Sequence, residues 1–442
     1  MRTRNIWRGT LWIALYLVLA LAPLGFMLAG ERPMGREFVR ELSVALGFVG
    51  IAMMALQFVV TARISTITLP YGSDIVYHFH HYMSLVVLGL WLAHPMLLFV
   101  KFPQTLALLN LITAPWRARA GVSSVVAIIV LVIISVWRKR LRIEYDRWRI
   151  WHGILAVLAL ILVMTHAFMV GKYIGTPMKR LLWLGYGAVW VLVVLYVRVI
   201  RPLRIARRPY AVADIRPEVG NVWVLALKPV GHAGMHFMPG QFAWLTAWKS
   251  PTAHVEHAFS FSSSAQRSEQ LEFGIKELGD FTATIGKLQP GHHVYLEGPF
   301  GTFSVDRYPD ARAYAFIAGG IGVTPIVSML RTLADRGDRR PLLLIYGNRD
   351  WEDVAFRKEL EELQERLNLK IVHVLERPPE GWEGEVGFVT KAMLDRYLPP
   401  EERQVTDIFL CGPPPMMDAV TAALIELNIH PKQIHFERFD LA

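Results

Sequence analysis

The chain has 442 residues, a formal net charge of +10, and a composition that is 53% hydrophobic and 19% charged. This length allows a membrane unit and one or two soluble domains, and the apolar segments concentrate before about residue 200. The basic residues cluster beside those segments, where they act as topology signals and contact anionic lipid, so the positive charge does not indicate a nucleic-acid-binding protein.

The apolar part of the chain is predicted to form six membrane-spanning helices, because each run is long enough to cross a bilayer. The first run follows Arg2, Arg4 and Arg8, as a secretory signal would. We nevertheless treat it as a span, because it is too long for a signal and no small-residue cleavage site follows it. The predicted spans are residues 8–29, 37–62, 77–100, 118–137, 148–170 and 179–200.

Two basic segments predict how these helices are oriented. Residues 137–149 carry six Lys or Arg and residues 198–208 carry five. In a chain of six spans both segments lie on the side of the N-terminus, so the positive-inside rule predicts that both termini are cytoplasmic. We expect an integral protein of a bacterial inner membrane.

Four histidines in these helices repeat one spacing. His80 and His94 lie in the third span and His152 and His166 in the fifth, fourteen residues apart in both cases. Fourteen residues of α-helix advance roughly 21 Å and return to within about 40° of the starting direction, so each pair lies on one helix face at two membrane depths. A single histidine in an apolar helix often only caps a carbonyl or faces water, but two matched pairs predict the ligands of two haems. The predicted orientation makes His80 and His152 the inner pair and the other two the outer pair.

His81 is the alternative to His80 as an inner ligand. Its thirteen-residue interval to His94 leaves the two about 140° apart on an ideal helix, so geometry favours His80 unless the helix is distorted. The single cysteine, Cys411, excludes an intrachain disulfide, a four-thiolate iron–sulfur cluster and a C-x-x-C-H attachment signature. The predicted haems are therefore non-covalent and b-type.

Beyond residue 208 the pattern changes to that of two soluble domains. Short β-like runs with turns between them predict a small antiparallel barrel, and from about residue 310 strands alternate with helices, which predicts a parallel, Rossmann-like sheet. The predicted strands are residues 221–228, 241–247, 313–318, 341–346, 370–375 and 407–411.

One motif in the predicted barrel suits a flavin. His257, Phe259 and Ser260 end a predicted strand with a ring to pack against the isoalloxazine, a hydroxyl near N5 and a donor for phosphate. Alternating phenylalanine and serine also occurs in any half-buried strand, so the motif carries little weight alone.

A second motif follows, Gly279-Asp280-Phe281-Thr282. Gly279 would allow a tight turn, and Thr282 would open a helical stretch whose amides can bind a pyrophosphate. Alone, the motif would be an ordinary glycine turn with a helix cap.

A glycine cluster in the last domain predicts a nucleotide site. Gly319, Gly320, Gly322, Thr324 and Pro325 follow a strand and open a helix, where backbone amides and the helix N-terminus can approach a pyrophosphate. The loop lacks the Lys-Ser/Thr ending of a Walker A motif, which argues against ATP.

Cys411-Gly412-Pro413 ends another strand at the carboxyl edge of the same predicted sheet, where ligands of open α/β folds bind. Cys411 could be a small buried residue, but its position beside the expected nicotinamide favours a role facing the substrate.

In this combination the chain resembles the ferric reductase and NADPH oxidase superfamily, and the resemblance covers almost the whole chain. The family's His-Pro-Phe-Thr flavin motif is matched by His257, Phe259 and Ser260, with Ala258 in place of proline. The other motifs correspond to Gly279–Thr282, Gly319–Pro325 and Cys411–Pro414, and the near-terminal aromatic that covers the flavin corresponds to Phe439.

The resemblance implies three domains and an electron path. These are a six-helix di-haem transmembrane domain (1–202), an FAD-binding β-barrel (203–305) and an α/β NAD(P)H-binding domain (306–442). Electrons would pass from cytosolic NAD(P)H through FAD and two b-type haems to an acceptor on the outer face. Two alternatives remain: a membrane-anchored flavin reductase that relays electrons to a protein partner, and a membrane receptor or transporter with a nucleotide-sensing domain.

The sequence leaves the nucleotide and the acceptor open. Arg349 could pair with a 2′-phosphate although Asp350 and Glu352 would repel one, so we expect NADPH with NADH also accepted. Oxygen and a ferric chelate are the expected acceptors, and no protein partner is required. Arg36 and Arg40, at the outer end of the second span, could supply positive charge for an anion or only mark the membrane boundary.

Overall fold

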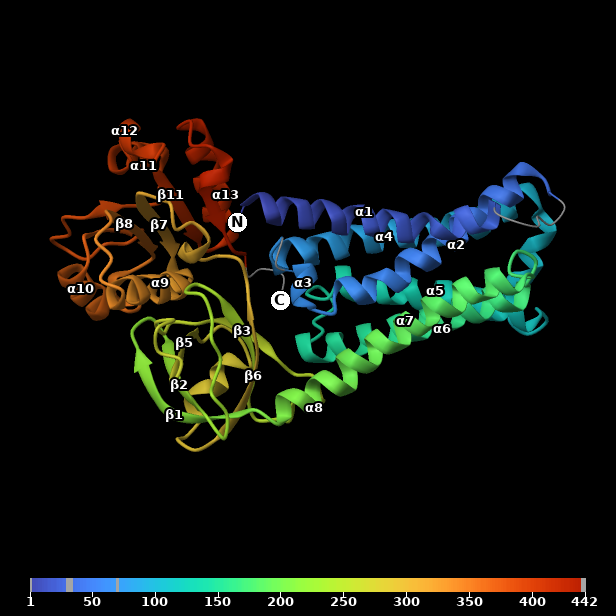
Figure 1. Cartoon of the computed structure of the whole chain (residues 1–442), viewed down its shortest axis with the longest axis horizontal. Coiled ribbons are helices and arrows are strands. Elements are labelled where there is room, and N and C mark those ends of the chain that lie inside the picture. The colour runs from blue at the N-terminus through green and yellow to red at the C-terminus, as the bar shows by residue number, and fades with distance from the viewer. Residues whose placement is uncertain (1, 29–34, 69–70, 439–442) are drawn as a thin grey trace. The chain divides into compact units, whose positions relative to one another are not determined.

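The computed structural model describes residues 2–28, 35–68 and 71–438, and the chain divides into two compact units between Arg201 and Pro202 (Figure 1). Each unit has its own hydrophobic core, because among the described residues no cluster of buried side chains includes members of both units.

The first unit is a helical bundle with six helices, among the described residues, that are long and apolar enough to cross a membrane. The prediction of six spans is confirmed. The helices are α1 (Arg2–Leu28), α2 (Phe38–Val60), α4 (Ser73–Lys101), α5 (Trp116–Val136), α6 (Tyr145–Val170) and α7 (Pro177–Leu195). Shorter helices are α3 (Ser65–Thr68) and the 3₁₀ turn η1 (Pro103–Leu109), and α7 continues through the π-helical η2 (Tyr196–Ile200) into α8 (Arg201–Ala206).

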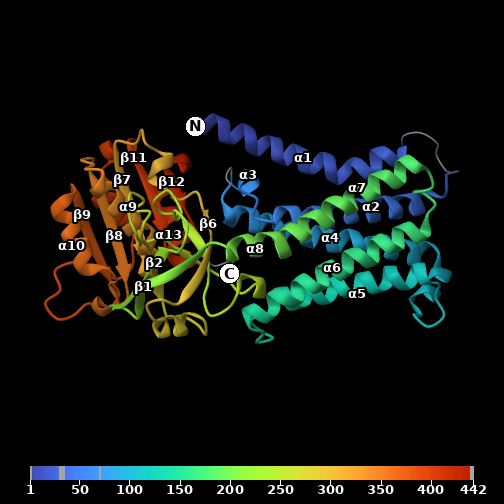
Figure 2. The same cartoon turned by 60° about the horizontal axis from the view of Figure 1, so that its bottom comes forward.

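Two antiparallel helix pairs pack most closely within the bundle, α2 with α4 and α5 with α6 (Figure 2). Small side chains let the backbones approach in each pair, as is usual between membrane helices. In the second pair Ala159 is fully buried, and the Ser124 hydroxyl donates to its carbonyl at 2.9 Å. In the first pair Gly50 makes room for the buried Trp91, because a Cβ there would lie 2.4 Å from the indole.

The second unit begins with an antiparallel barrel in the strand order β4-β3-β6-β1-β2-β5. A bridge between Phe261 and Phe273 joins the chain after β4 to β5 and closes the sheet. The interior is apolar and includes Leu225, Phe261 and Phe273. The strands are β1 (Pro209–Glu218), β2 (Val222–Pro229), β3 (Phe242–Thr246), β4 (His257–Ser260), β5 (Leu271–Lys276) and β6 (His293–Phe300).

The rest of the unit is a parallel sheet in the order β10-β9-β8-β7-β11-β12. Successive residues of each strand face opposite sides, so Phe316 packs on the face covered by α9 and α10, and Ile317 on the face covered by α11 and α13. The strands are β7 (Ala313–Gly319), β8 (Leu342–Asn348), β9 (Leu369–Leu375), β10 (Glu385–Val386), β11 (Thr406–Cys411) and β12 (Ile434–Phe436). The helices are α9 (Val323–Asp335), α10 (Arg357–Arg366), α11 (Lys391–Tyr397), α12 (Pro400–Arg403) and α13 (Pro414–Glu426).

The predicted fold class is therefore confirmed: a membrane bundle, an antiparallel barrel and a Rossmann-like α/β domain. Each of the six predicted strands lies within two residues of an observed one. Their signals are local, since buried parallel strands are continuously apolar and barrel strands alternate.

Candidate functional site

The four histidines of the bundle face one another in two pairs. The rings of His80 on α4 and His152 on α6 have centroids 6.2 Å apart, and those of His94 and His166 have centroids 6.3 Å apart. The interplanar angles are 68° and 70°, so the two pairs have nearly the same geometry at two levels of the bundle. His81 is exposed and packs against Tyr82, away from both pairs.

Backbone carbonyls fix the tautomers of the outer pair. The Nδ1 of His94 lies 2.8 Å from the carbonyl oxygen of Ser43, and the Nδ1 of His166 lies 2.7 Å from that of Arg117. A carbonyl oxygen can only accept, so both Nδ1 atoms carry the proton. The Nε2 lone pair of each ring is then available to a metal.

Side chains fix the tautomers of the inner pair. Ser135 donates its hydroxyl proton to the Leu131 carbonyl at 2.7 Å, so its oxygen accepts from Nδ1 of His152 at 3.1 Å. Gln57 directs its amide nitrogen to the Met53 carbonyl, which leaves Oε1 to accept from Nδ1 of His80 at 2.9 Å. Both inner rings therefore also keep Nε2 as a free lone pair.

This arrangement fits a metal ion held between each pair. An imidazole bound through nitrogen has its ring centre about 3 Å from the metal, so two imidazoles on opposite sides of one ion have ring centres about 6 Å apart. The measured separations of 6.2 and 6.3 Å meet that requirement. Anchored Nδ1 atoms are also what metal-ligating histidines normally show.

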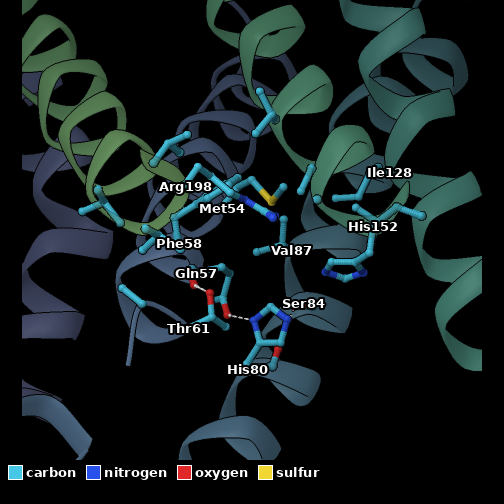
Figure 3. A pocket seen from close by; sticks show the side chains of 18 of the residues that line it. Met54, Gln57, Phe58, Thr61, His80, Ser84, Val87, Ile128, His152 and Arg198 are labelled. Atoms are coloured by element: carbon cyan, nitrogen blue, oxygen red, sulfur yellow. Dashed lines mark hydrogen bonds between the residues drawn. The ribbon is translucent and has the colours of Figure 1, made fainter. Parts of the chain in front are cut away.

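A pocket of about 820 Å³ contains the inner pair (Figure 3). It is mostly apolar, and Arg198, from the π-helical segment, is its one formally charged residue among the described residues that line it. Gly153 makes room for this guanidinium, because a Cβ there would lie 2.2 Å from Nη2. A cation in an apolar pocket suits a ligand with both a hydrophobic body and carboxylates, as haem has.

A larger pocket of about 1460 Å³ contains the outer pair. It extends to the 3₁₀ turn η1 and to the turn at Lys172 and Tyr173. Gly47 and Gly121 lie against the two histidine rings, with positions for a Cβ 3.3 Å from Nδ1 of His94 and 2.8 Å from Nδ1 of His166. Both helices thus leave space for the rings.

Arg36 and Arg40, which could supply positive charge for an anion or only mark the membrane boundary, are engaged within the protein. Arg36 donates to the Tyr173 hydroxyl at 2.9 Å and forms a 3.6 Å ion pair with Glu41. Arg40 stacks over the Phe102 ring at 4.0 Å. Their charge is therefore partly used locally, which their position in the sequence did not indicate.

The two proposed flavin motifs meet in the barrel. His257 on β4 stacks on Phe281 with ring centroids 3.9 Å apart, and Phe259 lies parallel to the same ring at 6.1 Å. Ser260 is buried at the end of β4, and Asp280 is exposed.

The turn at Gly279 does not depend on glycine, contrary to the sequence prediction, whereas Thr282 opens a helical stretch as predicted. A Cβ at Gly279 would touch nothing and its φ is not positive, so the turn does not depend on glycine. The Thr282 hydroxyl makes the turn instead, because it accepts from the amides of Leu278 and Gly279 at 2.8 and 2.9 Å. The helical stretch that begins at Thr282 is a six-residue 3₁₀ helix.

The nucleotide loop packs against the Cys-Gly-Pro segment. Gly320 has a φ of +52°, and a Cβ at Gly319 would lie 2.7 Å from Cδ of Pro413. A Cβ at Gly322 would lie 2.4 Å from the Cys411 carbonyl oxygen. These glycines bring two strand ends together at the carboxyl edge of the sheet, while Gly412, Thr324 and Pro325 flank the same place.

The remaining predicted site residues are Cys411, Arg349 and Phe439. Cys411 is 2% exposed, and burial raises the pKa of its thiol, so the thiol stays protonated at neutral pH. Arg349 is exposed after β8, and its neighbour Asp350 is paired with Arg377. Phe439 lies outside the described residues.

The barrel and the nucleotide domain are tightly joined beside these motifs. A Cβ at Gly274 on β5 would lie 3.1 Å from the Thr324 hydroxyl, so the barrel strand touches the start of α9. Nearby, Arg331 of α9 pairs with Glu272 of β5 at 2.7 Å. Burial would raise the pKa of Glu272, but Arg331 and Arg216 outweigh it and hold that pKa below its usual value.

Sequence reasoning missed the residues that hold the histidines. Ser43 and Gln57 lie fourteen residues apart on α2, the same interval as the histidines that they contact on α4. Polar side chains are costly within a membrane span, so Gln57 and Ser135 could have been singled out on that ground.

Comparisons with known proteins agree with this arrangement. Residues 46–163 match the ferric reductase like transmembrane component, residues 218–305 the oxidoreductase FAD-binding domain, and residues 316–422 the oxidoreductase NAD-binding domain.

Individual relatives cover part of the chain. The reductase component of propane 2-monooxygenase from Mycolicibacterium goodii is 30% identical over 234 residues, which are 52% of this chain and 66% of that protein. NADH–cytochrome b5 reductase 1 of Arabidopsis thaliana is 36% identical over 149 residues, 33% of this chain and 52% of that protein. The chain spans between about half and two thirds of the length of such curated relatives. Among solved structures, the ferredoxin reductase in carbazole 1,9a-dioxygenase is 27% identical with a TM-score of 0.46, and the match covers 52% of this chain and 69% of that one.

With these three domains in this order, the chain has the ferric reductase and NADPH oxidase-like architecture, that of a membrane-anchored oxidoreductase with FAD-binding and NAD-binding domains.

Proposed function

We propose that this protein is a transmembrane reductase that takes electrons from cytosolic NAD(P)H and passes them to an acceptor on the outer face of a bacterial inner membrane. The observation that carries the proposal is the two facing histidine pairs, whose anchored Nδ1 atoms leave the four Nε2 lone pairs available in two pockets. When bound, FAD would accept a hydride and release single electrons, and two b-type haems would carry those electrons between the pockets.

The residues of each domain have separate tasks in this proposal. His80 and His152 would hold the inner haem and His94 and His166 the outer one, while Arg198 offers charge to carboxylates in the inner pocket. In the other unit, His257, Phe259, Ser260 and residues 279–282 would hold the flavin, and residues 319–325 with residues 411–413 the nucleotide. Cys411 and Phe439 would lie beside the reacting rings.

The overall reaction balances with a one-electron acceptor. One NAD(P)H supplies two electrons and one proton as hydride, so it reduces two acceptors and leaves NAD(P)⁺ and one proton. Oxygen, reduced to superoxide, and a ferric chelate, reduced to the ferrous state, both satisfy that balance. Arg377 neutralises Asp350 beside Arg349, which favours NADPH over NADH.

Electron transfer across the membrane can be tested with sealed vesicles. The purified, FAD- and haem-loaded chain is inserted so that its second unit faces outward, NADPH is added outside, and a ferric chelate or cytochrome c is enclosed. We expect NADPH-dependent reduction inside the vesicles, and we expect His166→Ala to abolish it while leaving reduction of external dyes by NADPH unchanged. His81→Ala, on the exposed neighbour of His80, is the matched control and should transfer normally.

The enclosed reporter also separates the acceptors. Cytochrome c reduction that superoxide dismutase suppresses identifies oxygen, and fast anaerobic iron reduction identifies a ferric chelate. Transfer that persists in His166→Ala would rule out the two-haem path, and a wild-type chain that reduces neither reporter would point to a relay toward a protein partner.

A further inference from the structure

The two histidine pairs differ in what holds them. Each outer ring donates to a backbone carbonyl, of Ser43 or of Arg117, and His94 also contacts the Ser43 hydroxyl at 3.0 Å. The inner rings donate to the side chains of Gln57 and Ser135. A backbone carbonyl in a helix has a fixed position and strength as an acceptor. The strength of a side-chain acceptor depends on its own other hydrogen bonds.

Ser135 is shared among three hydrogen bonds. It donates to the Leu131 carbonyl and accepts both from Nδ1 of His152 and from the indole N–H of Trp148, the last at 3.1 Å. Because Trp148 competes for the hydroxyl oxygen, Ser135 is a weakened acceptor for His152. Trp148 also packs on the His152 ring at 5.2 Å and lies 5.4 Å below the guanidinium of Arg138.

The hydrogen bonds of Gln57 have the opposite effect, because they strengthen its side chain as an acceptor. Its amide nitrogen donates to the Tyr16 hydroxyl on α1 at 3.1 Å while its Oε1 accepts from His80. Donation from the amide nitrogen strengthens the amide oxygen as an acceptor, so Tyr16 supports the hold on His80. Gln57 is 3% exposed, so water does not replace these contacts.

We infer that Gln57 and Ser135 are positioning residues which, through Tyr16 and Trp148, set the reduction potential of the inner haem, whereas the backbone sets that of the outer haem. The inference rests on the proposed function, since it assumes that the four histidines bind haem. An acceptor at Nδ1 makes the imidazole a more basic ligand and stabilises ferric iron, so losing the acceptor raises the midpoint potential.

The experiment is an anaerobic redox titration of the haem absorption bands of the purified full-length chain, with haem content measured on the same samples. A His80→Ala chain, which keeps only the outer haem, assigns the two midpoints. We expect Ser135→Ala and Gln57→Leu each to shift the inner midpoint to higher potential and leave the outer one in place, with haem affinity at the inner site about 10- to 100-fold weaker. Trp148→Phe keeps the ring but removes the competing N–H, so it should shift the inner midpoint to lower potential.

Two variants serve as controls. Ser124→Ala removes a buried hydrogen bond between α5 and α6, the helices that carry Ser135 and His152, but Ser124 contacts neither ring, so neither midpoint should move. Ser43→Ala removes a hydroxyl that donates to the His94 carbonyl and lies 3.0 Å from Nδ1 of His94, but it keeps the backbone acceptor. The outer midpoint should therefore move much less in Ser43→Ala than the inner midpoint moves in Ser135→Ala.

The outcomes distinguish the inference from the proposed function. A wild-type chain that binds no haem ends both. A chain with two haems in which Ser135→Ala and Gln57→Leu move neither midpoint, or move both together, overturns the inference alone. If Ser135→Ala or Gln57→Leu loses the inner haem, the Trp148→Phe variant is the test. A shift of its inner midpoint to lower potential supports the inference, and a shift to higher potential refutes it.

Discussion

At the scale of the residue, nucleotide choice depends on the charges after β8. Arg349 is exposed, and Arg377 neutralises Asp350, one of the two acidic side chains that would repel a 2′-phosphate. A hydrogen bond between an arginine and a phosphate contributes about 1.5–3 kcal/mol, so Arg349→Ala should lower kcat/KM for NADPH by roughly tenfold or more. The value for NADH should barely change, and steady-state kinetics with both nucleotides check this.

Two further arginine variants make that measurement specific. Arg377→Ala leaves Asp350 without its partner, so it should also weaken NADPH use, through repulsion. Arg396→Ala breaks an ion pair between the exposed Arg396 and Glu385 elsewhere in the domain, and it should leave the ratio of kcat/KM for NADPH to that for NADH unchanged. An NADPH to NADH ratio that is the same with and without Arg349 would exclude this arginine from specificity.

At the scale of the element, the close packing of α5 against α6 depends on glycine. A Cβ at Gly121 would lie 2.8 Å from Nδ1 of His166, so Gly121→Ala should push that ring away from the Arg117 carbonyl. Alanine by itself stabilises a helix by about 1 kcal/mol relative to glycine, so any loss of haem in Gly121→Ala comes from the clash with His166 and not from helix propensity. We expect the haem content to fall from two toward one per chain, measured from the haem absorbance against protein.

Gly89→Ala is the control for the higher helix propensity of alanine, since nothing lies within 4 Å of a Cβ at that position. It should retain both haems and bind them as tightly as the unchanged chain. Full haem content in Gly121→Ala, with an unchanged spectrum, would contradict the packing described for the outer pocket.

At the scale of the whole molecule, the two units have separate hydrophobic cores. The core clusters of the second unit contain only residues between 210 and 434, and the cluster of the bundle only residues between 20 and 183. A chain that starts at residue 203 should therefore fold by itself, bind FAD, and reduce a soluble dye with NAD(P)H at a rate per flavin within a few-fold of the full chain. A purified fragment that aggregates or retains no flavin would show that the units depend on each other.

Much of this architecture is readable from local sequence signals. A membrane span is recognised by the length of its apolar segment, and a strand by the alternation or continuity of its apolar residues. The interval between two histidines determines whether they share a helix face, independently of what packs against the helix. For this reason the six spans, the six predicted strands and the order of the domains are confirmed, with bounds that differ by a few residues.

The tertiary structure alone decided which groups meet. His80 faces His152 while His81 is exposed, and Arg36 is engaged by Tyr173, more than a hundred residues away. The turn at Gly279 depends on a threonine hydroxyl rather than on glycine. Sequence by itself determined what each segment is, since hydrophobicity and helix period are properties of neighbouring residues, whereas hydrogen-bond partners such as Gln57 for His80 depend on how separate helices pack.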